Sequence, residues 1–428
     1  MKRLRLFRAL VAASLATGIS VGAGTASAQE LLFWSTQANP VEEAQAMRDQ
    51  VLAGFDGAVD FQPQEEGPFM TRIEAELQAG SGQIDVIGAL HGSFASIPDG
   101  LVDLTSVVDG LSSPASATYV ELGKLGTGEQ KYVPWMQATY VMAASREALE
   151  YLPEGADINA LTYDQLIAWA TALAENTGGP KFGLPAGPQG LIHRFVQGNL
   201  YPSFTDSMVT KFRSAEAEAM WGTMRELWAV TNPSSTNYGF MQEPLITGEV
   251  WLAWDHIARL ANAFNERPDD FVAFPSPAGP TGRGFMPVVA GLGVPVTAAD
   301  KDASNRLVAY MMQPDTQVAT LRATNFYPVV EVALPDDMPD SVRISGPAIA
   351  AQSASADANP GLLPIGLGPA GGEFNQVYRD TFERILLAGH DIRQVLDEQA
   401  ETLRTIVGTA GAPCWAPDPA SEGACPVE

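Results

Sequence analysis

The sequence predicts an α/β protein of two lobes that are joined by several chain crossings. The chain has 428 residues, more than one hydrophobic core ordinarily serves, so two domains are the default expectation. Short apolar runs alternate with amphipathic segments, which is typical of mostly parallel sheets flanked by helices. No flexible linker divides residues 29–330, and this favours lobes that exchange the chain more than once.

The alternation is clearest in the first ninety residues. "LLFWSTQ", "AVDFQPQ" and "IDVIGAL" are predicted strands. The helix "NPVEEAQAMRDQVLAGF" is predicted between the first two, because Asn39 can cap it, Pro40 suits its first position and Glu42 follows at capping-box spacing. The helix "PFMTRIEAELQAG" is predicted between the last two. Strand, helix, strand, helix, strand indicates a sheet wound with helices.

Later segments repeat the pattern. "YDQLIAWATALAEN", "ASNRLVAYMMQ" and "PDTQVATLRAT" are predicted helices, and "GFMPVVAGLGVPV" is strand-like. A C-terminal helical pair is predicted in "EFNQVYRDTFERILLAG" and "DIRQVLDEQAETLRTIVG". Residues 333–372 are rich in Pro, Gly, Ala and Ser, so we expect irregular surface structure there.

The first 28 residues are predicted to be a secretory signal peptide. Lys2, Arg3, Arg5 and Arg8 precede an apolar stretch, and "ASA" then offers small residues for cleavage. No later run of about 18 apolar residues is present, so no membrane-spanning helix is expected. We therefore expect a protein that is exported to the periplasm.

Charge and cysteine content narrow the function classes. The net charge is −25 at pH 7, which should repel nucleic acid and anionic membrane surfaces. The only cysteines, Cys414 and Cys425, lie in the C-terminal tail. An even pair in an exported chain predicts a disulfide bond.

Signals for enzymes and cofactors are few. The histidines, which are His91, His193, His256 and His390, are scattered without metal-ligand spacing. Neither a phosphate-binding loop nor a nucleophile elbow occurs. "GLGPAG" at residues 366–371 matches the dinucleotide pattern, but it follows proline-rich coil and reads better as a glycine-rich turn. We therefore expect no cofactor and no metal site.

One set of carboxylates could serve either catalysis or binding. Glu65 and Glu66 follow a predicted strand, where wound sheets place ligand loops, and Asp255 follows the apolar run "VWLAW". Together they could form the acid pair of a glycosidase. They could equally accept hydrogen bonds from sugar hydroxyls, or lie on the surface of an acidic chain with neither role.

Aromatic residues at strand ends carry a stronger signal. Trp34, Trp135, Trp251 and Trp254 each end a predicted strand or stand at a break, as does Tyr327. A ring beside a polar partner suits a sugar, whose C–H face stacks while its hydroxyls need donors and acceptors. Any one tryptophan could instead fill a core.

The segment "YVPWMQATYVM", residues 132–142, combines a strand pattern with a break. Pro134 removes a ladder donor from an otherwise apolar run, and Trp135 and Gln137 add a ring and an amide. A strand that leaves one lobe and enters another explains this combination, because its first ladder ends near the proline. Trp135 and Gln137 are then expected to face the cleft between the lobes.

These segments resemble the extracellular solute-binding proteins of carbohydrate ABC transporters, the family that includes maltose-binding protein. The resemblance covers most of the mature chain and rests on "LQAGSGQIDVIGAL", "LVDLTSVV", "KYVPWMQATYVMAASREALE", "PLITGEVWLAWDH", "GFMPVVAGLGVPV" and "TNFYPVV". One departure is "AS", Ala144 and Ser145, where the family usually has Tyr-Asn after the crossing.

The resemblance implies a two-lobed periplasmic binding protein fold and a carbohydrate ligand. It predicts an N-terminal lobe of residues 29–136 plus 290–326 and a C-terminal lobe of residues 137–289 plus 327–428. The ligand-binding residues expected from the match and from the carboxylate and aromatic patterns are Trp34, Gln37, Glu65, Glu66, His91, Trp135, Gln137, Trp254, Asp255, His256, Gly291 and Tyr327.

The expected partners are the permease subunits of an inner-membrane importer, and the protein itself is expected to be a monomer without enzymatic activity. Two other functions stay open from the sequence. One is a secreted glycoside hydrolase that uses Glu65 or Glu66 with Asp255. The other is a protein of the same fold that binds a polyamine or another cation, because carboxylates in the cleft would favour positive charge.

Overall fold

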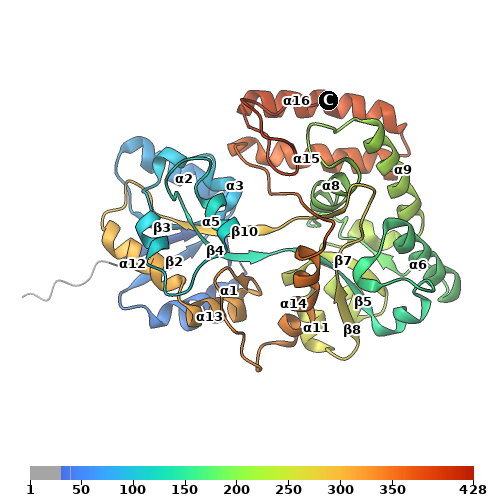
Figure 1. The fold of residues 1–428 in the computed structure, drawn as a ribbon, viewed down its shortest axis with the longest axis horizontal. Coiled ribbons are helices and arrows are strands. Elements are labelled where there is room, and N and C mark those ends of the chain that lie inside the picture. Colours follow the sequence, from blue (N-terminus) through green and yellow to red (C-terminus); the bar gives the residue numbers. More distant parts are fainter. Residues whose placement is uncertain (1–29, 39) are drawn as a thin grey trace, which may run out of the picture.

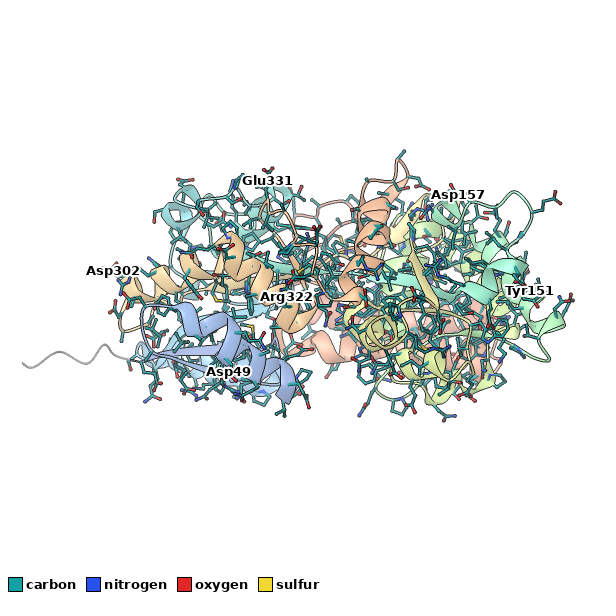
Figure 2. The ribbon with its side chains drawn as sticks, turned by 90° about the horizontal axis from the view of Figure 1, so that it is seen from below. Asp49, Tyr151, Asp157, Asp302, Arg322 and Glu331 are labelled. Atoms are coloured by element: carbon teal, nitrogen blue, oxygen red, sulfur yellow. A yellow bond between two sulfur atoms is a disulfide. The ribbon has the colours of Figure 1, made fainter. Side chains whose placement is uncertain are left out.

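The protein consists of two α/β lobes that stand side by side (Figure 1). The computed structural model describes residues 30–38 and 40–428, so the predicted signal peptide lies outside the described residues. In a view turned by 90°, the labelled Asp49 and Asp302 lie on the first lobe, and Tyr151 and Asp157 lie on the second (Figure 2). The predicted two-lobed α/β architecture is confirmed.

The first lobe is built on a six-stranded sheet with the strand order β11-β4-β10-β3-β1-β2. Its elements are β1 (Leu31–Ser35), α1 (Val41–Ala46), β2 (Val59–Pro63), α2 (Glu66–Ala79), β3 (Ile84–Leu90), α3 (His91–Phe94), α4 (Thr105–Asp109), α5 (Ala117–Gly123), β4 (Val133–Ala138), β10 (Val288–Gly293), α12 (Lys301–Met311), α13 (Pro314–Thr324) and β11 (Tyr327–Pro328). Helices cover both faces of the sheet, so β3 is buried on both sides, as its nearly continuous apolar sequence predicts.

The second lobe is built on a four-stranded sheet with the order β6-β7-β5-β8, and a small parallel pair, β9 and β12, lies beside it. Its elements are β5 (Tyr140–Ser145), α6 (Tyr163–Asn176), β6 (Phe182–Gly183), α7 (Ile192–Phe195), α8 (Tyr201–Thr205), α9 (Ala215–Ala229), α10 (Gln242–Ile246), β7 (Leu252–His256), α11 (Ile257–Glu266), β8 (Phe271–Phe274), β9 (Arg283–Phe285), α14 (Asp340–Ser353), β12 (Ala358–Pro360), α15 (Gly371–Phe382) and α16 (Ile392–Ala410). A π-helical turn, Val196–Leu200, joins α7 to α8.

Both sheets are mixed, which differs from the expectation of mostly parallel sheets. The pairings of β1 with β2 and β3 are parallel, whereas β10 is antiparallel to both β3 and β4. In the second lobe, β5 is antiparallel to both β7 and β8. The reason lies in the crossings: β4 carries the chain out of the first lobe and β10 brings it back, so these neighbours must run in opposite directions.

The lobes are connected by β4, β10 and the segment that follows β11 (Figure 1). Hydrogen bonds tie the crossings together at one place. The hydroxyl of Thr139, between β4 and β5, donates to the carbonyl of Met286 over 3.0 Å. The buried amide of Gln352 in α14 donates to the carbonyl of Tyr140 over 3.1 Å. Each lobe boundary expected from the sequence falls within β4, within β10 or at the start of β11.

Helix α14 was not predicted, because residues 333–372 were expected to be irregular. The helix spans Asp340–Ser353 and contains Pro347 in its interior. Proline and several small residues hide the helical period from sequence analysis. The helix nevertheless packs along β8 and α11 and supplies Gln352 to the crossing.

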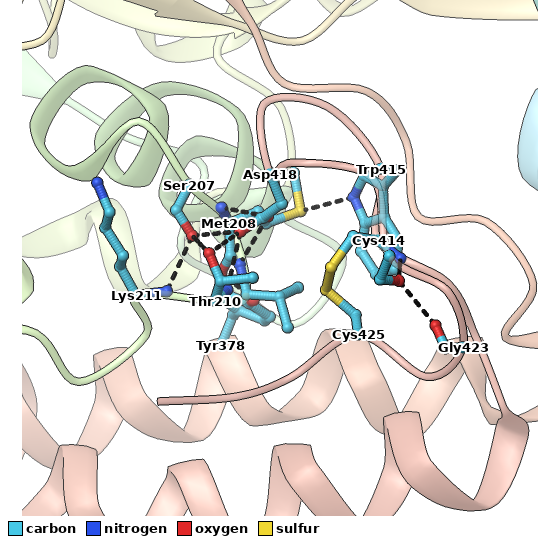
Figure 3. The surroundings of a disulfide bond; sticks show 12 residues. Ser207, Met208, Thr210, Lys211, Tyr378, Cys414, Trp415, Asp418, Gly423 and Cys425 are labelled. Atoms are coloured by element: carbon cyan, nitrogen blue, oxygen red, sulfur yellow. Dashed lines mark hydrogen bonds between the residues drawn. A yellow bond between two sulfur atoms is a disulfide. The ribbon is translucent and has the colours of Figure 1, made fainter.

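The C-terminal tail folds back onto the second lobe and carries the predicted disulfide bond between Cys414 and Cys425, which is confirmed (Figure 3). Asp418 anchors the tail, because its carboxylate accepts hydrogen bonds from the backbone N–H groups of Met208 and Val209, at 2.7 and 2.9 Å. Trp415 packs edge-on against Phe374 of α15 at 5.5 Å. The tail is therefore an integral part of the second lobe.

Candidate functional site

Two cavities lie between the lobes, on either side of a contact between α3 and the segment 362–368. The smaller, of about 70 Å³, is lined from the first lobe by Glu66 and Ser93 and from the second by Arg194 and Asn375. The larger, of about 590 Å³, is mainly apolar and is lined by residues that include His91, helix α5 and the tail residue Trp415. Both cavities take their walls from both lobes, so each depends on how the lobes meet.

The first-lobe wall of the smaller cavity consists of the starts of two helices. Glu66 is the first residue of α2, and its carboxylate accepts a hydrogen bond of 3.2 Å from the Ser93 hydroxyl in α3. Gly92 lies against the second lobe so closely that a Cβ there would stand 2.3 Å from the carbonyl oxygen of Pro364. This glycine permits the lobes to approach each other.

The second-lobe wall carries a guanidinium group that belongs to a polar chain. Arg194 of α7 donates to the Gln197 side chain over 3.0 Å, and Gln197 donates to Asn375 of α15 over 3.1 Å. Burial lowers the pKa of Arg194, while the nearby Tyr140 and Glu66 favour its charged form. Gln197 lies in the π-helical turn, a feature often found at functional sites.

An aromatic layer lies where the crossing strand enters the second lobe. The ring of Tyr140 stacks on that of Trp254 with 4.7 Å between centroids, and it meets His256 edge-on at 5.1 Å. Burial raises the pKa of Tyr140 to about 12 and lowers that of His256 to about 3. Both side chains are therefore neutral at physiological pH.

Residues 38–318, more than half of the chain, match the family of bacterial extracellular solute-binding proteins. The chain belongs to this family. The resemblance that the sequence motifs indicated is thereby confirmed. No significant match was found among curated protein sequences.

Solved structures with the same fold include several that were determined with solutes bound. Maltose-bound MalE3 of T. maritima has a TM-score of 0.69 and 17% identity, over 88% of this chain and 99% of that one. The GacH receptor of Streptomyces glaucescens, studied with acarbose, has a TM-score of 0.68 and 17% identity, with coverages of 89% and 98%. UgpB of Mycobacterium tuberculosis in complex with glycerophosphocholine has a TM-score of 0.68 and 16% identity, with coverages of 89% and 98%. At these identities the likeness shows a shared fold.

Two further features concern membrane spans and metal sites. None of the helices described for this solute-binding protein is long and apolar enough to cross a membrane. Within the same described residues, no group of three His, Cys, Asp or Glu side chains is placed to hold a metal ion.

The predicted tryptophans do not face a cleft. Trp135 is 0% exposed in the core of the first lobe, 5.7 Å from Phe33, and Trp254 is 0% exposed in the core of the second. Trp34 is buried on the other face of the first sheet, where the Arg72 guanidinium lies 4.5 Å from its ring. Side chains along a strand point alternately to the two faces of its sheet. Helices cover both faces of these sheets, so a ring at a strand end still packs into a core.

Asp255 is also interior. It is wholly buried, and its two oxygens accept backbone N–H bonds from Met241 and His256 over 2.9 and 2.8 Å. Burial raises its pKa to about 7, against the lowering effect of Arg259. A buried carboxylate with both oxygens engaged does not form an open acid pair with the exposed Glu65 or Glu66. His256 caps the start of α11 through its Nδ1, which accepts from Ala258 over 3.3 Å.

Two predicted residues support the crossings. The Gln137 side chain donates to the carbonyl of Pro328 over 3.0 Å and accepts from the Tyr119 hydroxyl over 2.5 Å. The Tyr327 hydroxyl donates to the carbonyl of Val342 over 2.9 Å. The first of these bonds joins β4 to β11, and the Tyr327 bond joins β11 to α14, so both side chains hold the region of the crossings together.

His91 and Gly291 belong to one packing arrangement, and Gln37 lies apart from it. The Nδ1 of His91 lies 2.7 Å from the Tyr132 hydroxyl, and a Cβ at Gly291 would stand 2.1 Å from the Tyr132 ring. Glycine is therefore needed in β10 to admit this tyrosine. Gln37 is half-buried after β1, where its amide donates to the Thr36 hydroxyl over 2.9 Å.

The structure brings Glu66 and His91 to interlobe cavities, together with residues that sequence analysis missed. These are Ser93, Arg194 and Asn375. A signal for Arg194 was available, because no acidic residue occurs between Asn176 and Thr205 in this otherwise acidic chain. Asn375 had no comparable signal, since its helix reaches the cavity only after the chain has crossed between lobes for the last time.

Proposed function

We propose that this protein is the solute-binding component of an ABC importer and that it captures a carbohydrate-class solute between its lobes. The observation that carries the proposal is the polar cavity lined by Glu66 and Ser93 from one lobe and by Arg194 and Asn375 from the other. A site assembled from two lobes couples ligand binding to lobe closure. The sugars bound to structural relatives, maltose and acarbose, support the choice of solute class.

Closure in this mechanism is a hinge motion at the crossings. The bonds from Thr139 and Gln352 hold the crossing segments together, while each lobe keeps its own core. Solute that contacts both walls binds the closed arrangement better than the open one and so shifts the population towards it. The permease then receives the closed, loaded protein, and ATP hydrolysis belongs to a partner subunit.

The remaining parts of the proposal concern location and assembly. We propose export to the periplasm, with cleavage after residue 28, and action as a monomer. Of the residues expected from the sequence, we place Glu66 and His91 in the binding site. The fully buried Trp135 and Trp254 are left out of the site, because a side chain without exposed surface offers a solute nothing to contact.

The test is binding without turnover. Mature protein should be stabilised by one class of sugar, by about 2.7 kcal/mol at a hundredfold excess over its dissociation constant, and chromatography of the mixture should show no product. Hydrolysis that Glu66→Gln abolishes would replace this proposal with the glycosidase. Stabilisation by spermidine, without any response to sugars, would replace it with the cation-binding function.

A further inference from the structure

Three guanidinium groups gather around one loop of the second lobe, behind the smaller interlobe cavity. Arg259 of α11 donates to the carbonyl of Gln189 over 3.0 Å, and Arg379 of α15 donates to the carbonyl of Gly190 over 2.7 Å. Arg194 follows this loop directly and lines the cavity. Arginines from two distant helices thus bind the loop that leads into Arg194. We call these three residues the arginine cluster.

The arginine cluster makes no close ion pair. Among the residues that the structure describes, no carboxylate lies within 4.0 Å of any of these guanidinium groups. The acidic groups that act on the cluster are Glu66 across the cavity, the buried Asp255 and Glu383, one turn after Arg379 in α15.

None of these carboxylates neutralises Arg194 directly. Glu66 accepts the Ser93 hydroxyl, and both oxygens of Asp255 accept backbone N–H groups. Removing a cation from water is costly unless an anion compensates it. On a chain of net charge −25, the cluster is therefore a local concentration of positive charge that lacks a close partner from the protein.

The other donors around the cavity also suit an anion. Gly368, in the 3₁₀ turn before α15, and Gly371, the first residue of this 12-residue helix, line the cavity together with Asn375. The N-terminus of a helix carries partial positive charge and favours anions. Glu373, in the same turn, lines a different groove beside α16. The glycine-rich stretch 366–371 thus leads into a helix start at the cavity wall.

We propose that the smaller interlobe cavity binds an anionic group of the solute, a carboxylate or a phosphate, with Arg194 as its direct ligand. Asn375 supplies a neutral donor, the start of α15 adds partial positive charge, and Arg259 and Arg379 supply positive potential from behind. The cavity of about 70 Å³ holds a group of a few heavy atoms, since one water needs roughly 10–15 Å³. The proposal rests on the proposed function and narrows its solute class to acidic carbohydrates.

Titration calorimetry with matched solutes tests this proposal. The pairs are glucose with glucuronate, galactose with galacturonate, and glucose with glucose 6-phosphate, so that the arms separate a carboxylate from a phosphate. We expect a charged member to bind at least tenfold more tightly than its neutral partner, and this preference should weaken as the salt concentration rises. Arg194→Gln should weaken binding of the charged solute at least tenfold. Arg306→Gln, which changes an exposed arginine of α12, should leave this binding unchanged.

Glu66→Gln separates this proposal from an alternative in which Arg194 serves only to attract Glu66 when the lobes close. An anion site predicts that Glu66→Gln tightens binding of the charged solute, because the variant removes a negative charge that faces Arg194. The alternative predicts that Glu66→Gln weakens binding as Arg194→Gln does. A neutral sugar that binds as tightly as its charged partner would overturn the anion site and leave the proposed function standing. Failure of every solute to bind would overturn both. If Arg194→Gln does not fold, a salt-independent affinity of the wild type would overturn the anion site.

Discussion

A single methyl group at Gly92 should hold the two lobes apart. A Cβ at this position would stand 2.3 Å from the carbonyl oxygen of Pro364 in the opposite lobe, whereas carbon and carbonyl oxygen ordinarily approach to about 3.3 Å. The facing surfaces must therefore separate by about 1 Å. Gly92 does not occupy the left-handed region, so alanine should fit its own backbone and the cost should fall on closure.

The magnitude follows from the size of the clash. Overpacking of this kind costs about 1–3 kcal/mol, because a backbone carbonyl cannot rotate away as a flexible side chain can. If the solute binds the closed arrangement, its apparent dissociation constant rises as the closed fraction falls. The expected loss of affinity is about 5- to 150-fold, with little change in the thermal stability of the lobes.

Calorimetry with the sugar that binds the wild type measures the loss, and small-angle scattering of the saturated protein measures the separation of the lobes. Gly67→Ala is the matched control, since Gly67 lies in α2 of the same lobe and a Cβ there would meet nothing within 4 Å. Wild-type affinity and unchanged scattering for Gly92→Ala would refute the reasoning. The solute-bound lobes would then not meet at α3, and the cavities beside this contact would not be the binding site.

Three other outcomes follow from burial. Trp254→Ala should lower the free energy of unfolding by about 3–5 kcal/mol in denaturant titration, because the ring lies in the second core, and Trp254→Phe should cost less. The double variant Cys414→Ser and Cys425→Ser should lose roughly 3 kcal/mol at most and show a lower melting temperature. Burial lowers the pKa of His91 from 6.5 to about 4, so only the unfolded chain takes up this proton between these values. Stability should therefore fall as pH drops through that window, by about 3 kcal/mol for this group, and His91→Gln should flatten the profile.

Each of these outcomes has a contrary result. A stable Trp254→Ala protein that binds solute poorly would return Trp254 to the binding site. An unchanged melting temperature after removal of both cysteines would mean that the hydrogen bonds of Asp418 hold the tail in place without the disulfide bond. A His91→Gln profile as steep as that of the wild type would assign the acid sensitivity to other buried groups, such as His256.

The proposed binding site was predictable only in part, because placement between the lobes depends on segments that are distant in the sequence. Glu66 and His91 follow strands β2 and β3, and the end of a strand is a local feature that indicates where ligand loops begin. Trp135 and Trp254 satisfy the same local rule but point into cores. Which face of a strand is open depends on the helices that cover it, and strand sequence does not contain that information.

Most of the helices and strands, and the family, could be predicted without the structure. The strand "IDVIGAL" and the helices "YDQLIAWATALAEN" and "PDTQVATLRAT" have the predicted bounds in β3, α6 and α13, because a short apolar run and a helical period of 3.6 residues are both local features of the sequence. The disulfide was also predictable, from two cysteines in an exported chain.

Only the tertiary structure decided how the strands run and which charges meet. The return of β10 beside β4 makes the first sheet mixed, and α14 places Gln352 at the hinge despite a sequence that looked irregular. Arg194, Arg259 and Arg379 come from three separate helices, yet Arg259 and Arg379 donate to the adjacent carbonyls of residues 189 and 190. Electrostatic potential depends on distance in space, so this cluster exists only once the chain has folded around one loop.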